Sequence, residues 1–166
     1  MPETARRQFL REKEAVRLLD ELSRRLKIDV KELLDAKKPS VEVAQSLGAE
    51  MVYLEGKPFA ARLKELLIPT LLFEKALQCL PKIVVNMGAV PHICNGADVL
   101  APGMVGIEGA FAVDGLVVVV DERHKQPLAV MAALVDSQTA RSLSRGKVAR
   151  NLHFVGDALW TQLKKG

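Results

Sequence analysis

The sequence predicts an α+β protein whose first half mixes helices and strands and whose second half consists of short strands. In the first half, apolar residues recur at roughly helical spacing from Thr4 to about Leu26, with charged residues between them. In the second half, two strongly apolar runs, 115–121 and 127–135, have the composition of strands. A loop rich in small residues, Asn95 to Met104, precedes these runs. We expect residues 82–160 to form one small module organised around this loop.

The first half begins with helices and continues with strands. Asp29 is expected to cap a short second helix that runs to Asp35. Apolar residues between Val41 and Leu54 indicate short strands, and Glu55-Gly56 favours a hairpin turn into the segment 58–63.

A proline marks the expected end of the first domain. Leu67 to Thr70 is predicted to be a break, followed by a helix from Thr70 to about Leu80. Pro81 ends that helix, because the residue before a proline avoids the α region. No stretch rich in Gly and Ser follows, so the junction is expected to be rigid. The predicted domains are residues 1–81 and residues 82–166.

The second half predicts a small, partly closed barrel of five or six short strands. Strands are expected at 82–85, 116–120, 128–135 and 148–155, and 116–120 has the continuous apolar character of a strand buried on both faces. A helical turn is expected at 88–94 and a short helix at 137–142. Turns are expected between Gly106 and Gly109, which flank one, at a hairpin signal of Asp114-Gly115, and along the polar segment 121–126.

Composition limits the classes of protein to consider. The chain of 166 residues is 49% apolar, which is typical of a folded protein, and it has no apolar run of about 18 residues that would span a membrane. Its N-terminus is charged rather than apolar and it contains two cysteines, so we expect a cytoplasmic protein with free thiols. The net charge of +4 permits an anionic partner.

Basic residues gather in one stretch of the second half. Residues 137–156 contain no acidic side chain but include Arg141, Arg145, Lys147 and Arg150. Two interpretations remain open: a solvated turn and helix end, or an edge that contacts phosphates.

The patterns of common catalytic and metal sites are not met. Arg145-Gly146-Lys147 lacks the glycine and the hydroxyl residue that a phosphate-binding loop requires at fixed positions. His92 and Cys94 are too close in sequence to favour a thiol–imidazole pair, and the histidines and cysteines lack metal-ligand spacing. We therefore expect no catalytic residue, no metal and no cofactor.

Several segments of the second half together resemble a PUA domain, an RNA-binding module. They are Val85 to Val90, Asn95 to Gly103, the valine-rich strand, Asn151 to His153, and Gly156 to Trp160. With Ile68 to Leu71, the chain is similar to the malignant T-cell amplified sequence family of translation proteins and its archaeal relatives. The resemblance implies a small α/β pre-PUA domain followed by a PUA pseudo-barrel of short strands.

The resemblance also implies an RNA-binding face formed by the Gly88-Ala89 turn, the Asn95 to Gly103 loop and the last strand. Glycine and alanine let the backbone approach a ribose-phosphate closely. His92 stands where family members often have lysine, and Asn86 where aspartate is common. With the basic positions included, the candidate RNA-binding residues are Lys82, Gly88, Ala89, His92, Asn95, Gly96, Ala97, Asp98, Leu100, Pro102, Gly103, Arg145, Lys147, Asn151 and His153.

The predicted function is non-enzymatic RNA binding, to the acceptor end of a tRNA or to the small ribosomal subunit, in translation initiation or recycling. The eukaryotic members of the family work with a density-regulated partner protein, so the N-terminal domain is a candidate surface for a protein partner. The main alternative is an accessory RNA-binding subunit of a tRNA- or rRNA-modifying enzyme. A third is a protein adaptor whose PUA fold binds no RNA.

Overall fold

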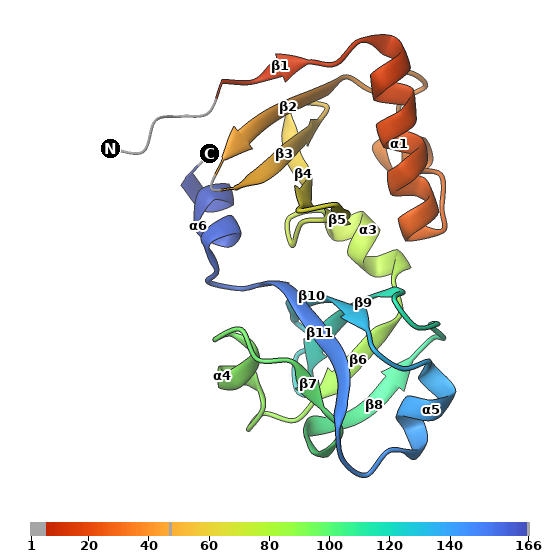
Figure 1. Ribbon diagram of the computed structural model, residues 1–166, viewed down its shortest axis with the longest axis vertical. Coiled ribbons are helices and arrows are strands. Elements are labelled where there is room, and N and C mark those ends of the chain that lie inside the picture. Colours follow the sequence, from red (N-terminus) through yellow and green to blue (C-terminus); the bar gives the residue numbers. More distant parts are fainter. Residues whose placement is uncertain (1–5, 47, 166) are drawn as a thin grey trace. The chain divides into compact units, whose positions relative to one another are not determined.

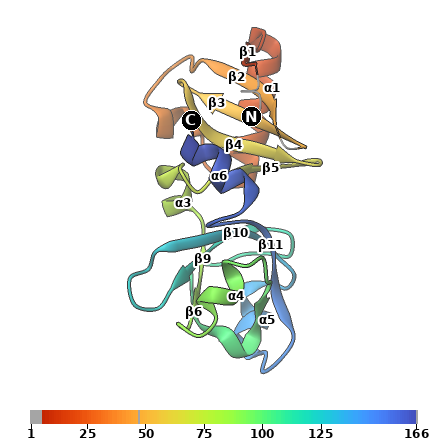
Figure 2. The ribbon, with the colours of Figure 1, turned by 90° about the vertical axis from the view of Figure 1, so that its left-hand side faces the viewer.

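The computed structural model describes residues 6–46 and 48–165. The chain divides into two compact units between Ala76 and Leu77. Each unit is built on its own sheet, and the strands and helices of both are drawn in Figures 1 and 2.

The sheet of the first unit is antiparallel and has the strand order β1-β2-β3-β4-β5. The strands are β1 (Gln8–Phe9), β2 (Val41–Ser46), β3 (Ala49–Leu54), β4 (Lys57–Leu63) and β5 (Leu66–Pro69). The hairpin turn predicted at Glu55-Gly56 is confirmed. Both residues have positive φ, +52° and +81°, as a tight turn between β3 and β4 requires.

Three helices accompany this sheet: α1 (Glu12–Leu26), α2 (Val30–Leu34) and α3 (Glu74–Cys79), the last of which runs across the division between the units. The apolar face of α1 is buried through Leu18, Leu19, Leu22 and Leu26. The carboxylate of Asp29 accepts the amide of Lys31 at 3.0 Å, which confirms it as the cap of α2.

The start of the first helix differs from the prediction. The helix expected from Thr4 begins at Glu12, and Gln8 and Phe9 instead pair with β2; Thr4 itself lies outside the described residues. Arg7 fixes this short strand, because its guanidinium ion-pairs with Glu42 at 2.8 Å and lies 3.9 Å from the centre of the Tyr53 ring. Tertiary pairing thus outweighs local helical spacing in these residues.

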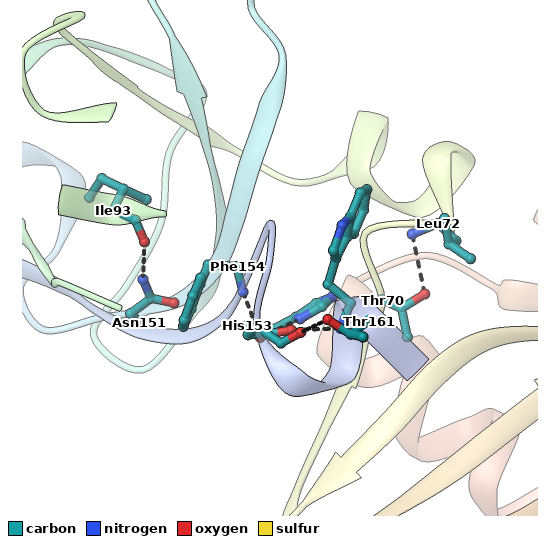
Figure 3. A network of polar contacts seen from close by, with 9 residues as sticks. Thr70, Leu72, Ile93, Asn151, His153, Phe154 and Thr161 are labelled. Carbon is teal, nitrogen blue, oxygen red and sulfur yellow. Dashed lines mark hydrogen bonds and ion pairs between the residues drawn. The ribbon is translucent and has the colours of Figure 1, made fainter. Parts of the chain in front are cut away.

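The segment before Pro81 also differs from the prediction. The expected break at 67–70 is mostly strand β5, and the helix expected from Thr70 begins at Glu74. Pro69 is tolerated because β5 is an edge strand, where a missing amide donor leaves no neighbour unpaired. Thr70 forms a turn instead. Its hydroxyl donates to the Pro58 carbonyl at 3.0 Å and accepts the Leu72 amide at 3.3 Å, and Figure 3 shows the second of these bonds.

The second unit contains a curled sheet in the order β7-β11-β10-β9-β6-β8. Only the β6–β9 pair among these described strands is parallel. The strands are β6 (Lys82–Val85), β7 (Val99–Leu100), β8 (Met104–Glu108), β9 (Leu116–Asp121), β10 (Pro127–Ala133) and β11 (Lys147–Phe154). The helices are α4 (Val90–Ile93), the 3₁₀ turn η1 (Ala101–Gly103), α5 (Ser137–Ser142) and α6 (Ala158–Lys165).

Most of the predicted strands of this unit are confirmed, and β9 is buried along its whole length as expected. Three details differ. Gly106 lies inside β8 rather than in a turn. Asp114-Gly115 does not form a hairpin, because β8 and β9 both pair with β6 and not with each other. Helix α6 was not predicted.

One carboxylate joins the end of β11 to the start of α6. Asp157 accepts the amide of Trp160 at 2.6 Å and the amide of Phe154 at 2.9 Å, and it lies 2.8 Å from Nδ1 of His153 (Figure 3). Burial works to raise the pKa of Asp157, but the hydrogen bonds from His153 and the two amides outweigh it and hold this pKa below its ordinary value.

Replacing this carboxylate should destabilise the second unit. We expect Asp157→Ala to lower the free energy of unfolding by about 1–3 kcal/mol, because it removes a helix cap and leaves buried donors without their acceptor. The folded-state pKa of Asp157 is depressed, so its contribution is complete above the unfolded-state value of about 3.9 and is lost as pH falls through the folded-state value.

Urea unfolding followed by fluorescence of Trp160, the single tryptophan, measures this effect. The exposed Asp20→Asn is the matched control, and it should unfold like the wild type at neutral pH. An Asp157→Ala curve that coincides with the wild type at neutral pH would show that the carboxylate is not part of the fold's stability.

Candidate nucleic-acid interface

A groove of about 400 Å³ opens in the second unit where two neighbouring segments meet. One segment is the turn after β6 together with α4, and the other runs from Ala97 through β7 and η1. Buried side chains of Val85, Ile93 and Val99 contribute to its lining. The remaining lining residues are small, polar or exposed: Asn86, Ala89, His92, Ala97, Asp98, Leu100, Pro102 and Gly103.

The two segments lie close together at Gly103 and Ala89. A Cβ atom built on Gly103 would lie 3.2 Å from the Cβ of Ala89, which is tighter than ordinary contact. The amide of Asn86 donates to the Gly103 carbonyl at 2.9 Å, and its side-chain Oδ1 accepts the amide of Ala89 at 2.9 Å. Asn86 therefore shapes the turn and ties it to η1. The short distance between the two segments leaves little room for a side chain at position 103, which favours glycine there.

Asn151 joins β11 to the loop that forms the other part of the groove. Its side-chain amide donates to the carbonyl of Ile93 at 3.2 Å (Figure 3) and to that of Ala97 at 3.0 Å. Its backbone amide donates to the Asp98 carboxylate at 2.9 Å. These bonds hold both ends of the loop between α4 and β7. The structure therefore assigns Asn151 to positioning the loop.

Gly96 and Asn95 complete this loop. Gly96 has φ +96°, a backbone conformation that residues with a side chain rarely adopt. A Cβ atom at this position would lie 3.4 Å from the Phe154 ring. Asn95 is exposed, and its amide donates to the His92 carbonyl at 3.0 Å. Both residues lie next to the lining residues in the chain but do not line the groove themselves.

The basic stretch of 137–156 is divided between different places. Lys147 pairs with Leu100 in the β11–β7 ladder, and its ammonium lies 3.2 Å from the Asp98 carboxylate, so it stands beside the groove. The neighbouring Gly146 accepts the amide of Ala101 at 2.9 Å, and Arg145 is exposed next to it. Arg141, by contrast, donates to the carbonyl of Gly109, beyond the far end of β8.

Two predicted residues lie away from the groove. Lys82 begins β6 opposite Glu108, whereas the groove lies at the other end of that strand, at Val85. The ring of His153 is 0% exposed and contacts Asp157, which leaves the ring no surface for RNA. The structure thus corrects the placement of His153 on the RNA face: it has a structural role beside the start of α6.

Sequence reasoning missed the contribution of the connection between β9 and β10. The Glu122 carboxylate accepts the amide of Met87 at 3.1 Å, which brings this connection against the turn that lines the groove. The available signal was the polar run from Asp121 to Gln126 between two apolar strands. Asn86 was noted as a departure from a common aspartate, but its hydrogen bonds to both sides of the groove could not be read from the sequence.

The described residues contain no group of three or more His, Cys, Asp or Glu side chains arranged to hold a metal ion. Burial raises the pKa of the Cys94 thiol, which disfavours the reactive thiolate. Within the described part of the chain, no helix is long and apolar enough to cross a membrane.

Comparisons with family models cover both units. Residues 81–155 match the PUA domain, and residues 6–75 match a domain of unknown function, DUF1947. An uncharacterized protein from Methanocaldococcus jannaschii is 36% identical over 159 residues, which cover 95% of this chain and 97% of that protein.

Two relatives have names that describe their roles. Translation machinery-associated protein 20 of Eremothecium gossypii is 32% identical over 103 residues, which cover 58% of this chain and 57% of that protein. A probable tRNA pseudouridine synthase B from Pyrobaculum islandicum is 38% identical over 88 residues, which cover 53% of this chain and 26% of the synthase. The match with the synthase thus leaves most of that protein without a counterpart here.

A solved structure resembles the whole chain. The crystal structure of a hypothetical protein from Pyrococcus horikoshii has a TM-score of 0.80 and 31% identity, and the match covers 94% of this chain and 98% of that one. The PUA match and the translation-associated relative support an RNA-binding role. The chain belongs to the family of PUA-domain proteins that carry a DUF1947 region ahead of the PUA domain, an archaeal-type relative of the malignant T-cell amplified sequence proteins.

Proposed function

We propose that this protein binds an unpaired RNA end in the groove of its PUA domain and performs no chemistry on it. The RNA is the acceptor end of a tRNA or a strand of the small ribosomal subunit, and the protein acts in translation in the cytoplasm. The observation that carries the proposal is the groove itself, which combines buried apolar lining with small-residue walls and exposed polar groups.

The shape of the groove suits a base that has left its stack. Sequence-specific recognition of RNA targets single strands and ends, because their bases can be splayed out and contacted on faces and edges. Because Gly103 and Ala89 have little or no side chain, the protein backbone at these positions can come close to such a base. The exposed Leu100 and Pro102 offer apolar contact at the rim. A regular duplex keeps its bases stacked and offers nothing to insert.

Polar groups for a ribose-phosphate lie in the groove or next to its lining residues. Among the hydrogen bonds of the described residues, the backbone amide of Gly88 has no protein acceptor, and Gly88 is exposed. His92 lines the groove and is exposed. The Lys147 ammonium lies 3.2 Å from the carboxylate of Asp98, another lining residue. An amide and cations of this kind are the usual partners of phosphate oxygens.

The names of the relatives support a role in translation. A translation machinery-associated protein matches more than half of this chain, so we assign the RNA to the translation apparatus. The first unit carries a separate groove of about 540 Å³, whose lining combines apolar residues such as Leu34 and Phe59 with the charged Glu55, Lys57, Glu74 and Lys75. This second groove supports a protein partner bound by the first unit.

The alternative function is that of an accessory RNA-binding subunit of a modifying enzyme. It is favoured by the 38% identity to a tRNA pseudouridine synthase. The two functions differ in their partner. An accessory subunit should copurify with a modifying enzyme and stimulate it, whereas a translation protein should sediment with ribosomal subunits or bind tRNA alone.

Removal of the tRNA end tests the proposal. Wild-type protein should bind intact tRNA at least about tenfold more tightly than tRNA lacking its 3′ end, a difference of about 1.4 kcal/mol, because the groove holds that end. A duplex of similar size should bind like the shortened tRNA. The measurement is a titration of all three RNAs across a salt series. Equal affinities with a steep salt slope would show purely electrostatic contact and contradict end recognition.

A matched pair of glycine variants tests the groove. Gly103→Val places a side chain against Ala89 and should weaken binding of intact tRNA at least about tenfold, or about 1.4 kcal/mol, because the walls cannot approach the RNA as before. Gly106→Val is the control, since a Cβ on Gly106 in β8 meets no atom within 4 Å. Binding is measured by titration and folding by thermal unfolding. Equal affinity in both folded variants would place the RNA elsewhere.

A further inference from the structure

We propose that the hairpin tip between β9 and β10, residues 122–126, is a second phosphate-binding surface that extends the groove along a single strand of RNA. The side chains that carry this role are Arg123 and His124. The inference rests on the proposed function, since the strand is the one whose end the groove holds. It adds a length requirement, because the RNA must be long enough to leave the groove and reach the tip.

The tip is held in one conformation by a buried carboxylate. Asp121 is 4% exposed and accepts three backbone amides, those of Arg123 at 2.9 Å, His124 at 2.6 Å and Gln126 at 3.0 Å. The hydrogen bond from the His124 amide leads the effects that hold the pKa of Asp121 below its ordinary value, so this carboxylate stays ionised and keeps its three bonds. A preorganised tip loses little entropy when its side chains bind a ligand.

The tip is joined to the turn that lines the groove. Asp121 is in register with Val85 in the parallel β9–β6 pair, so the tip and the turn leave the sheet at the same end. The Glu122 carboxylate then accepts the Met87 amide at 3.1 Å. The next residue, Gly88, presents the unpaired amide described above. The tip projects from the body of the second unit in Figure 2, and Arg123 and His124 are exposed.

The tip differs from two lysines of this unit, because within the described residues its arginine and histidine form no ion pair with a carboxylate, a property that the exposed Arg145 and Arg150 share. Lys147 lies 3.2 Å from the Asp98 carboxylate, and Lys125 lies 2.7 Å from that of Glu108. Among the ion pairs of the described residues, none includes the side chain of Arg123 or of His124, although both residues are exposed. The neighbouring Glu122 is occupied by the Met87 amide. The Arg123 guanidinium is therefore exposed and forms no ion pair in the described part of the chain, although the carboxylates of Asp121 and Glu122 adjoin it in the chain, and a phosphate is a ligand that a guanidinium suits.

An unpaired RNA strand fits this arrangement better than a duplex. The groove is proposed to hold a base at the RNA end. The Gly88 turn comes next to the groove and the tip comes next to that turn, so the flexible backbone of an unpaired strand can follow this path. The contacts at the tip involve phosphates only, so they are independent of sequence. Loss of one such contact should weaken binding of every sufficiently long strand to the same extent and should lower its salt dependence.

Arg123→Gln tests the tip, with Arg141→Gln as the matched control, because Arg141 is an exposed arginine of the same unit that donates to the Gly109 carbonyl away from the groove. The probes are a fluorescently labelled single-stranded RNA of about eight nucleotides, within the range that single-strand binding folds cover, and a labelled dinucleotide with the same 3′ end. Affinities are measured by anisotropy across a salt series.

We expect Arg123→Gln to weaken binding of the longer RNA about fivefold and to reduce the slope of log K against log salt by about 0.7, the value for one phosphate contact on a single strand. Binding of the dinucleotide should be unchanged. Arg141→Gln should match the wild type on both probes, and Arg123→Lys should restore the salt slope.

The outcomes separate the two proposals. If Arg123→Gln matches Arg141→Gln on the longer RNA while Gly103→Val still weakens it, the tip is not a phosphate-binding surface and the groove proposal stands. If Arg123→Gln weakens the dinucleotide as much as the longer RNA, the tip acts through the groove and the length requirement is wrong. If wild-type protein binds neither RNA, the proposed function itself fails.

Discussion

The groove depends on two small sets of hydrogen bonds. One set fixes the loop between α4 and β7 against β11, and the other ties the turn after β6 to η1. Asn151 in β11 holds the carbonyls of Ile93 and Ala97 and, through its backbone amide, the carboxylate of Asp98. Asn86 makes the corresponding bonds on the other side, to Gly103 and Ala89. Loops lack the regular ladder of a sheet, so their backbone groups need partners of this kind to hold one conformation. The space between the two loops is the space in which an RNA end is proposed to lie.

Carboxylates in the second unit serve mainly as acceptors for backbone amides. Asp121, Asp136 and Asp157 each receive at least one amide at the start of a turn or helix, and each has a pKa below its ordinary value. These three carboxylates therefore stabilise turns and helix starts within the unit. Among the described residues, the side chains of Arg123 and His124 at the hairpin tip form no ion pair, although their backbone amides donate to the Asp121 carboxylate. The net charge of the chain is +4. Which basic side chains form ion pairs is therefore more informative about a candidate RNA-binding face than the net charge of the chain.

The sequence predicts strands with strong local signals and misses features that depend on distant partners. The valine-rich β9 and the Asp29 cap follow from composition and spacing, and both are confirmed. β1 could not be foreseen, because it exists through pairing with β2 across about thirty residues of chain. The same reasoning applies to the site. The Asn95 to Gly103 segment shows its small residues directly, whereas the burial of His153 and the contact between Glu122 and Met87 arise only when the sheet curls.

The most direct test of the central claim is an NMR titration of the ¹⁵N-labelled full chain with a short single-stranded RNA that carries a tRNA-like 3′ end. Binding in the groove predicts that the largest amide shift changes fall on Ala89, Ala97 and Leu100 and on the turn around Gly88. Changes confined to α5 or to the first unit, with the groove amides unmoved, would contradict binding in the groove.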